Sequence, residues 1–93
     1  MEPYTAPDEG ATPAEQLARR IRAAKLPPPA ERARIRREAR ITLREFAQVL
    51  GVTATTVYRW EIGDADPKTD HAVAYADLLG KVRGALDPEE ETA

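Results

Sequence analysis

The sequence predicts an all-α fold: a compact bundle of four to five short helices, with an extra basic helix at the N-terminal end. Apolar residues recur three or four positions apart, as Phe46 and Leu50 do, so that they share one face of a helix. The pattern Thr-x-x-Glu at 12–15 and again at 42–45 is a capping box, which marks where a helix begins. The chain of 93 residues is long enough for one small domain.

The first third of the chain is predicted to lie outside this domain. Residues 1–11 combine proline, glycine and acidic residues without periodicity, so they are expected to form a flexible tail. A basic amphipathic helix is expected over 12–26, with Leu17 and Ile21 as a thin apolar stripe. The three prolines at 27–29 end this helix and predict a stiff linker.

The main helical domain is predicted over 30–83, followed by an acidic tail over 84–93. Its helices are expected at about 30–39, 42–50 and 54–61, and from about 70 to 82. Thr69 or Asp70 is expected to cap the last of these helices. Trp60 and Tyr75 are predicted to belong to the core, and the single histidine, His71, to be exposed.

The connection between the second and third helices of this domain predicts a helix-turn-helix. Gly51 lets the chain leave the first of them through a left-handed conformation. Val52 fills the corner, and the hydroxyl of Thr53 caps the next helix. Ala47 is small where the two helices must cross closely. Such a crossing leaves the outer face of the second helix, a recognition helix at about 53–62, free to enter a DNA major groove.

Positive charge is concentrated in one segment, although the whole chain carries a net charge of −2. Residues 19–44 contain ten arginine and lysine residues and only two glutamates. Because the local field governs the approach to phosphates, this segment favours nucleic acid binding in spite of the overall charge. The alternative is a solvated helix face in a protein of arginine-rich composition, but the position of the cluster beside the helix-turn-helix favours the functional interpretation.

Other classes of function receive little support from the sequence. The absence of cysteine and the single histidine exclude zinc fingers and multi-histidine sites, so we expect no metal and no cofactor. There is no apolar run of the roughly 20 residues that span a membrane, and no signal-peptide pattern, which predicts a cytoplasmic protein. Neither a nucleophile with its base nor a glycine-rich phosphate loop is recognisable, and we therefore expect no enzymatic activity.

Six short motifs of the domain occur together in one known family. They are Ile35-Arg36, Ile41-Thr42, Phe46-Ala47, Leu50-Gly51-Val52-Thr53, Val57 and Trp60-Glu61-x-Gly63. With them, residues 32–79 resemble the Cro and lambdoid-repressor family, also called XRE-type helix-turn-helix proteins. The resemblance implies that Arg36 and Glu61 pair across the core. It also implies structural roles for Phe46, Ala47, Leu50, Gly51, Val52, Val57 and Trp60.

The resemblance further implies which residues contact DNA. Its base-reading positions fall on Ala54, Thr55 and Arg59, of which Arg59 could donate two hydrogen bonds to guanine or, as an alternative, contact a phosphate. Its phosphate-contacting segments match 42–44 and 62–63. Together with the neighbouring basic and polar residues, these positions predict phosphate contacts from Thr42, Arg44, Thr53, Thr56, Tyr58, Arg37 and Arg40.

Two departures from the family pattern weaken the expected recognition code. Leu43 stands where the family usually has glutamine, so Thr42, Arg44 and the backbone amides of this helix must anchor the phosphates. The recognition helix also lacks the pair of glutamines that reads adenine in some members. Modest specificity, or reliance on the shape of the DNA, is therefore expected.

The sequence thus predicts a sequence-specific transcriptional regulator, a repressor, whose partner is double-stranded DNA. Pairing of two copies as a homodimer, and a protein partner held through residues 13–26, are left open. Two other functions also stay open: an antitoxin or protein-binding adaptor, and a small phage-type accessory factor that bends DNA or binds it cooperatively.

Overall fold

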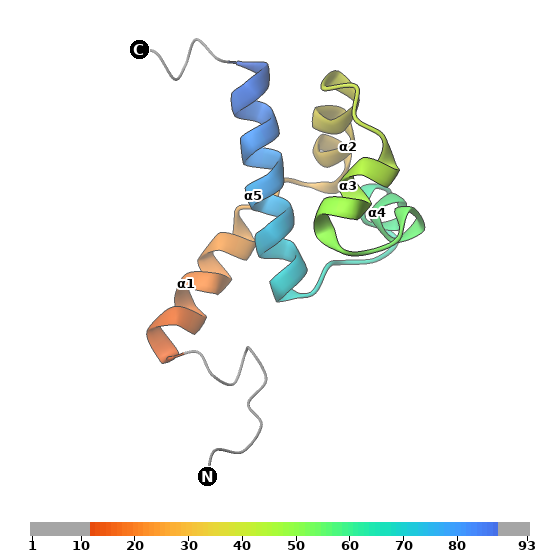
Figure 1. Ribbon diagram of the computed structural model, residues 1–93. Helices are drawn as coiled ribbons and strands as arrows, with labels where there is room; N and C mark the ends of the chain where they lie inside the picture. The colour runs from red at the N-terminus through yellow and green to blue at the C-terminus, as the bar shows by residue number, and fades with distance from the viewer. Residues whose placement is uncertain (1–11, 88–93) are drawn as a thin grey trace.

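The structure, a computed structural model, describes residues 12–87, and this part of the chain consists of five α-helices joined by short loops (Figure 1). They are α1 (Pro13–Ala24), α2 (Pro29–Glu38), α3 (Leu43–Leu50), α4 (Ala54–Glu61) and α5 (Thr69–Leu86). The all-α prediction is confirmed. The predicted tail over 1–11 and the end of the predicted acidic tail lie outside the described residues. No helix within 12–87 is long and apolar enough to cross a membrane.

Helix α1 begins at the first capping box. The Thr12 hydroxyl accepts the backbone N–H of Glu15 at 3.1 Å, and the Glu15 carboxylate accepts that of Thr12 at 2.9 Å. These hydrogen bonds, led by the one from the Thr12 backbone, hold the pKa of Glu15 below its usual value. No residue of α1 is buried, so its position depends on a shallow contact with the rest of the molecule.

The starts of α2 and α5 differ from the sequence-based expectation. Helix α2 begins at Pro29, which the expected linker included, because proline suits the first turn, where its missing N–H is not needed. Helix α5 begins after Lys68, which makes no side-chain capping bond, so neither Thr69 nor Asp70 is its cap.

Helix α5 also runs further than expected, to Leu86, so that residues 84–86 are helical and do not belong to a tail. Glycine at position 80 weakens a helix by about 1 kcal/mol. Val82 offsets this cost by packing against the core, and Arg83 forms an ion pair with Glu31 of α2. Tertiary contacts therefore allow α5 to continue as a helix beyond Gly80.

The core lies between α5 and the helices α2, α3 and α4. It is formed by Ile35, Phe46, Ala47, Leu50, Val57, Trp60, Tyr75 and Leu79. The Tyr75 ring is at its centre, 6.2 Å from the Phe46 ring and 5.4 Å from the Trp60 ring between centroids. His71 is not an exposed surface residue: it is half-buried, with its ring 5.6 Å from that of Trp60.

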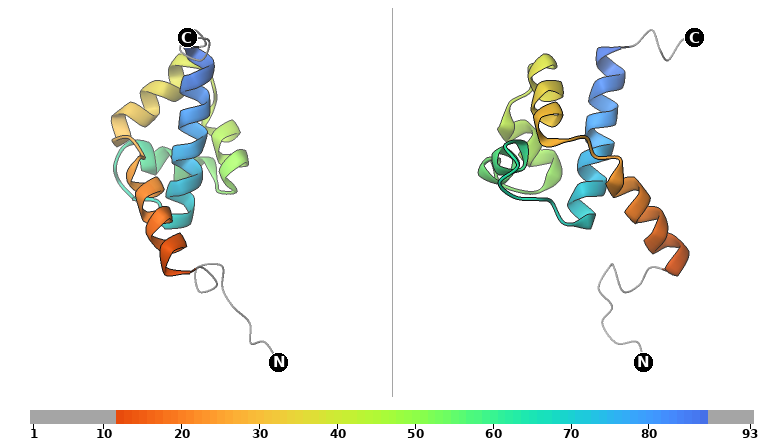
Figure 2. Two further views of the ribbon diagram at one scale, coloured as in Figure 1. Left: turned by 90° about the vertical axis from the view of Figure 1, so that its left-hand side faces the viewer. Right: turned by 180° about the vertical axis from the view of Figure 1, so that it is seen from behind.

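The arrangement of the helices places α5 between two parts of the molecule. Figures 1 and 2 show α2, α3 and α4 on one side of α5 and α1 on the other. Among the helices, α1 packs against α5 alone. The predicted basic helix is therefore docked on the domain, across α5 from the helix-turn-helix.

Candidate nucleic-acid interface

The turn between α3 and α4 has the geometry that the sequence predicts. Gly51 adopts φ 71° and ψ 31°, and its N–H donates to the Ala47 carbonyl, to which Val52 also donates. A Cβ at Gly51 would meet no atom within 4 Å, so the left-handed backbone, and not lack of space, demands glycine there. Thr53 then caps α4 by accepting the N–H of Thr56 at 3.1 Å.

Helix α4 divides sharply into a buried and an exposed face. Val57 and Trp60 point into the core and fix the rotation of the helix about its axis. Thr55, Tyr58 and Arg59 are exposed on the other face. A short helix held in this way can present its exposed face to a groove without moving.

Ala54, one of the three expected base-reading residues, differs from the other two in its surroundings. It is half-buried and packs against the core cluster, so only part of its methyl group faces outward. The hydroxyls of Thr53 and Thr56 lie 2.9 Å apart and bond to one another in the cap, which limits their availability for phosphate.

Arg59 is already engaged in the free protein. Its Nε donates to Asp64 Oδ2 at 2.9 Å, and its backbone carbonyl accepts the N–H groups of Asp64 and Ala65. Gly63, with φ 78°, turns the chain so that Asp64 comes back to the end of α4. Because both side chains are about half exposed, the pair contributes only about 0–1 kcal/mol and can open readily.

The sequence analysis did not identify Asp64 as a functional residue. Asp64 follows Arg59 by five residues, which is not a helical spacing. The signal that could have found it is Gly63, whose left-handed turn reverses the chain directly after the recognition helix.

Three of the expected phosphate contacts form a cationic cluster at the ends of α2 and α3. Arg37, Arg40 and Arg44 are exposed and make no ion pair with any described residue. Thr42 stands at the N-terminus of α3, where its hydroxyl accepts the Glu45 N–H at 3.0 Å and its own N–H donates to the Glu45 carboxylate at 2.8 Å. Thr42 is thus a cap, with the first turn of α3 beside it.

Arg40 has an unusual backbone conformation. It has φ 60° and is the one residue other than glycine with positive φ among the described residues. Its N–H donates to the Arg37 carbonyl at 2.9 Å, and the N–H of Ile41 donates to that of Arg36 at 3.1 Å, which closes the C-terminus of α2. Glycine usually occupies this position, because a side chain there costs about 1–2 kcal/mol.

Arg36 and Glu61 form the pair that the resemblance implies. Arg36 Nε donates to Glu61 Oε2 at 2.6 Å and a terminal nitrogen donates to Oε1 at 3.0 Å, while the other terminal nitrogen donates to the Ile41 carbonyl at 2.8 Å. The Arg36 and Glu61 side chains are only 12% and 3% exposed. The hydrogen bond to Glu61 raises the pKa of Arg36 and ties α2 to the end of α4.

Arg32 is a buried structural residue that the sequence analysis counted only as part of the basic segment. Its Nε donates to the Pro27 carbonyl at 2.6 Å and a terminal nitrogen donates to the Trp60 carbonyl at 3.1 Å. Its guanidinium carbon lies 5.7 Å from the centre of the Tyr75 ring. Burial lowers the pKa of Arg32. The burial of Arg32 could have been predicted from its position, one turn before Ile35 on the inward face of α2.

The basic segment is therefore divided in space. Arg37, Arg40 and Arg44 lie on the side of α5 that carries α4, whereas Arg20 and Arg22 belong to α1 on the other side and Lys25 follows directly as its C-cap. Within residues 12–87, no three His, Asp or Glu side chains come together in a way that could hold a metal ion.

Comparison with known proteins agrees with this geometry. A family described as helix-turn-helix matches residues 33–84, more than half of the chain. No curated protein and no solved structure gives a match. The matched segment contains α3, the turn at Gly51, α4 and the Arg36–Glu61 pair. The chain therefore belongs to the XRE-type helix-turn-helix family of DNA-binding regulators.

Proposed function

We propose that the chain is a cytoplasmic transcriptional repressor that recognises double-stranded DNA by inserting α4 into the major groove. The observation that supports this proposal is that α4 has one buried face and one exposed face. Val57 and Trp60 anchor one face in the core, while Thr55 and Arg59 are exposed on the other. A repressor needs only this DNA-binding surface, because a protein bound over a promoter excludes polymerase.

The phosphate contacts come from the ends of two helices. The first turn of α3 presents backbone N–H groups and the Arg44 side chain, and the C-terminus of α2 adds Arg37 and Arg40. Amides at a helix N-terminus suit an anion, and each neutralised phosphate releases counterions. We expect the dependence of log K on log salt to become shallower by about 1 for each of these arginines replaced by alanine.

Base reading depends on an exchange of partners at Arg59. In the free protein its guanidinium binds Asp64. On the correct site it would leave Asp64 and donate two hydrogen bonds to guanine, which favours the right base by about 1–3 kcal/mol. The exposed ion pair costs at most about 1 kcal/mol to break, so the exchange is favourable only where guanine is in place.

Selection of bound duplexes from a random DNA library, with the full-length protein at moderate salt, tests this function. We expect a motif containing guanine, repeated with two-fold symmetry if two copies bind half-sites about 34 Å apart. Arg59→Ala should lower the preference for this motif by about 5–150-fold. The matched control is Arg22→Ala, which removes an exposed arginine from α1, across α5 from α4, and should leave the preference unchanged.

The absence of any enriched motif would contradict sequence-specific recognition by α4, as would an equal effect of the two alanine variants. Repression is tested separately, by transcription from a promoter that overlaps the selected motif. Added protein should lower the yield of transcript, and a rise would show activation instead.

A protein-binding adaptor or antitoxin is a second candidate, supported by the surface of α1. Leu17 and Ile21 are 55% and 62% exposed on a helix that buries no residue. An adaptor should bind its partner normally with Arg59→Ala and lose the partner when α1 is deleted.

A further inference from the structure

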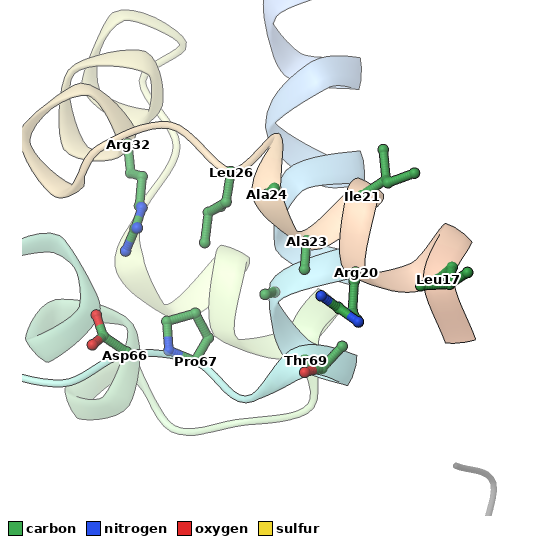
Figure 3. A pocket seen from close by; sticks show the side chains of 11 residues that line it. Leu17, Arg20, Ile21, Ala23, Ala24, Leu26, Arg32, Asp66, Pro67 and Thr69 are labelled. Carbon is green, nitrogen blue, oxygen red and sulfur yellow. The ribbon is translucent and has the colours of Figure 1, made fainter. Parts of the chain in front are cut away.

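An open groove of about 810 Å³ lies between α1 and the loop that leads into α5. Figure 3 shows Leu17, Arg20 and Ile21 on the α1 side, and Pro67 and Thr69 on the loop side. The floor contains small or apolar residues of both helices and of the linker between α1 and α2. The groove is distinct from the exposed face of α4, because no residue of α4 lines it.

The groove contains apolar surface that the fold does not use. Leu17 and Ile21 are four residues apart and share one face of α1, yet more than half of each side chain is exposed. The contact between α1 and α5 therefore does not bury this pair. Adjacent exposed aliphatic side chains beside a concave surface are typical of a binding site for another molecule.

The charge around the groove is positive and partly unpaired. Arg20 makes no ion pair or hydrogen bond with any described residue. Asp66, the acidic residue of the lining, lies near the buried guanidinium of Arg32, whose pKa burial lowers and the Asp66 charge partly restores, so the charge of Asp66 is offset within the protein. Glu15, the acidic residue of α1, is held in the capping box.

We propose that this groove binds an acidic amphipathic helix of a protein partner. Two aliphatic side chains four residues apart on the partner would cover Leu17 and Ile21, and a carboxylate flanking them would pair with Arg20. The matching spacing on both surfaces favours a helix, and the positive charge of α1 requires an acidic one.

Charge and position argue against the other occupants. A second copy would bring its own α1, with the same excess of positive charge, against this one. DNA held by the exposed face of α4 would contact Thr55, Tyr58 and Arg59, none of which lines the groove. The acidic residues at the C-terminal end of the sequence, Glu89 to Glu91, lack a large apolar residue to cover the exposed pair.

The experiment uses the full-length protein and a synthetic probe, read by fluorescence anisotropy at low salt. The probe is a labelled peptide of about 18 residues. Its leucines are spaced alternately three and four residues apart, so that they share one helical face, and the other positions are glutamate. A second peptide has the same composition, with the leucines shuffled so that they share no helical face. We expect a dissociation constant of about 10–100 µM for the amphipathic peptide and at least tenfold weaker binding for the shuffled one.

Substitutions locate the binding. The double variant Leu17→Ser, Ile21→Ser should weaken binding about tenfold or more, because it removes the apolar half of the contact without changing charge. Its helical circular dichroism should be unaltered, since both side chains are exposed. Arg20→Gln should weaken binding at low salt and have little effect at high salt. Val49→Ser is the control, because Val49 is 67% exposed on α3, away from the groove.

Five results would overturn the proposal. Equal binding of the two peptides, or equal binding by the double serine variant, would show an attraction of charge alone. A dimer of the protein that the double serine variant dissolves would identify a second copy as the occupant. Binding of the peptide only after residues 1–11 or 88–93 are removed would identify a tail of the same chain. Loss of DNA binding with Arg20→Gln and Arg22→Gln, as large as with Arg59→Ala, would assign the surface of α1 to DNA.

Discussion

At the scale of single residues, Arg40 combines a strained backbone with a place in the cationic cluster. Its φ of 60° is one that glycine adopts without strain, and its side chain is exposed near Arg37 and Arg44. An arginine at this position lowers the stability of the fold relative to glycine and adds a positive charge beside the helix-turn-helix. Strained residues of this kind are found mostly at functional sites.

Replacement of Arg40 by glycine should therefore separate stability from binding. We expect Arg40→Gly to raise the free energy of unfolding by about 1 kcal/mol, because the left-handed conformation no longer carries a side chain. The same change should weaken DNA binding and make it less dependent on salt. Urea unfolding and DNA titration measure the two effects. Arg37→Gly is the control, since glycine inside α2 should lower stability by about 1 kcal/mol.

Tyr75 gives a prediction for alkaline pH. Its hydroxyl is buried without a hydrogen-bond partner in the described chain, and burial raises its pKa to about 12. An unfolded tyrosine loses its proton near pH 10, so between pH 10 and 12 the unfolded state is favoured by release of a proton that the folded state retains. Stability should fall by about 2–3 kcal/mol across this range as the pH rises.

The variant Tyr75→Phe isolates this effect. At pH 7 it should change stability by less than about 1 kcal/mol, because it removes a hydroxyl that has no partner. Between pH 10 and 12 it should lack the loss that the tyrosine causes, so the difference between the two proteins in thermal or urea unfolding should grow with pH. A constant difference would mean that the Tyr75 hydroxyl titrates normally.

The Arg36–Glu61 pair should be the most costly ion pair to break. Glu61→Ala leaves the Arg36 guanidinium largely buried without its carboxylate, a loss of about 3–5 kcal/mol, which is enough to unfold much of a small domain. Arg34→Ala is the control, because the Arg34–Glu38 pair is more than half exposed and should contribute less than about 0.5 kcal/mol. Comparable losses in urea unfolding would show that burial does not set the cost.

At the scale of elements, the sequence predicted helices best where local chemistry marks their ends. The capping boxes at Thr12 and Thr42 and the glycine at 51 set the limits of α1 and α3. The start of α5 was not predictable in this way, because no side chain caps it. Its end depends on Val82 and on the Arg83–Glu31 pair, which are tertiary contacts without a local pattern.

The candidate site shows the same limit of sequence reasoning. The outward position of Thr55 and Arg59 follows from the apolar spacing of α4, and the Arg36–Glu61 pair was available from the resemblance. The burial of Arg32 under the Trp60 carbonyl and the return of Asp64 to Arg59 depend on how segments meet in space. Periodicity within one helix carries no information about either contact.

Helix α1 should be dispensable for the fold of the other four helices. It buries no residue and packs against α5 alone. Removal of residues 1–24 should leave a cooperatively unfolding protein, with a midpoint lower by about 5–15 °C for a loss of about 1–2 kcal/mol. DNA affinity should change little. Loss of cooperative unfolding in calorimetry would show that α1 is an integral part of the core.

At the scale of the whole molecule, α5 separates two surfaces with different charge partners. The helix-turn-helix side presents Arg37, Arg40 and Arg44, and the α1 side presents the groove with Arg20. The two sides meet only through α5 and the linker after α1, and no ion pair between described residues joins α1 to α2, α3 or α4.

Occupation of the two surfaces should therefore be nearly independent. At about 0.15 M salt, where the screening length is about 8 Å, saturating DNA should change the affinity for the acidic peptide by less than about threefold. The reverse measurement must give the same factor, because coupling between two binding equilibria is reciprocal. A larger factor, measured by anisotropy in either direction, would show that α5 transmits binding from one side to the other.

The contact between Arg59 and Asp64 bears on how such a protein finds its site among many wrong ones. On unrelated sequence no guanine is in place to accept hydrogen bonds from Arg59, so we expect the Arg59–Asp64 pair to be closed more often than on the specific site, while Arg37, Arg40 and Arg44 contact the phosphates. The nonspecific encounter with DNA then depends on Arg37, Arg40 and Arg44, whereas recognition of the specific site depends on Arg59. A protein with Asp64→Ala would carry Arg59 unpaired during its search, and it should dwell longer on incorrect DNA without gaining as much on its own site.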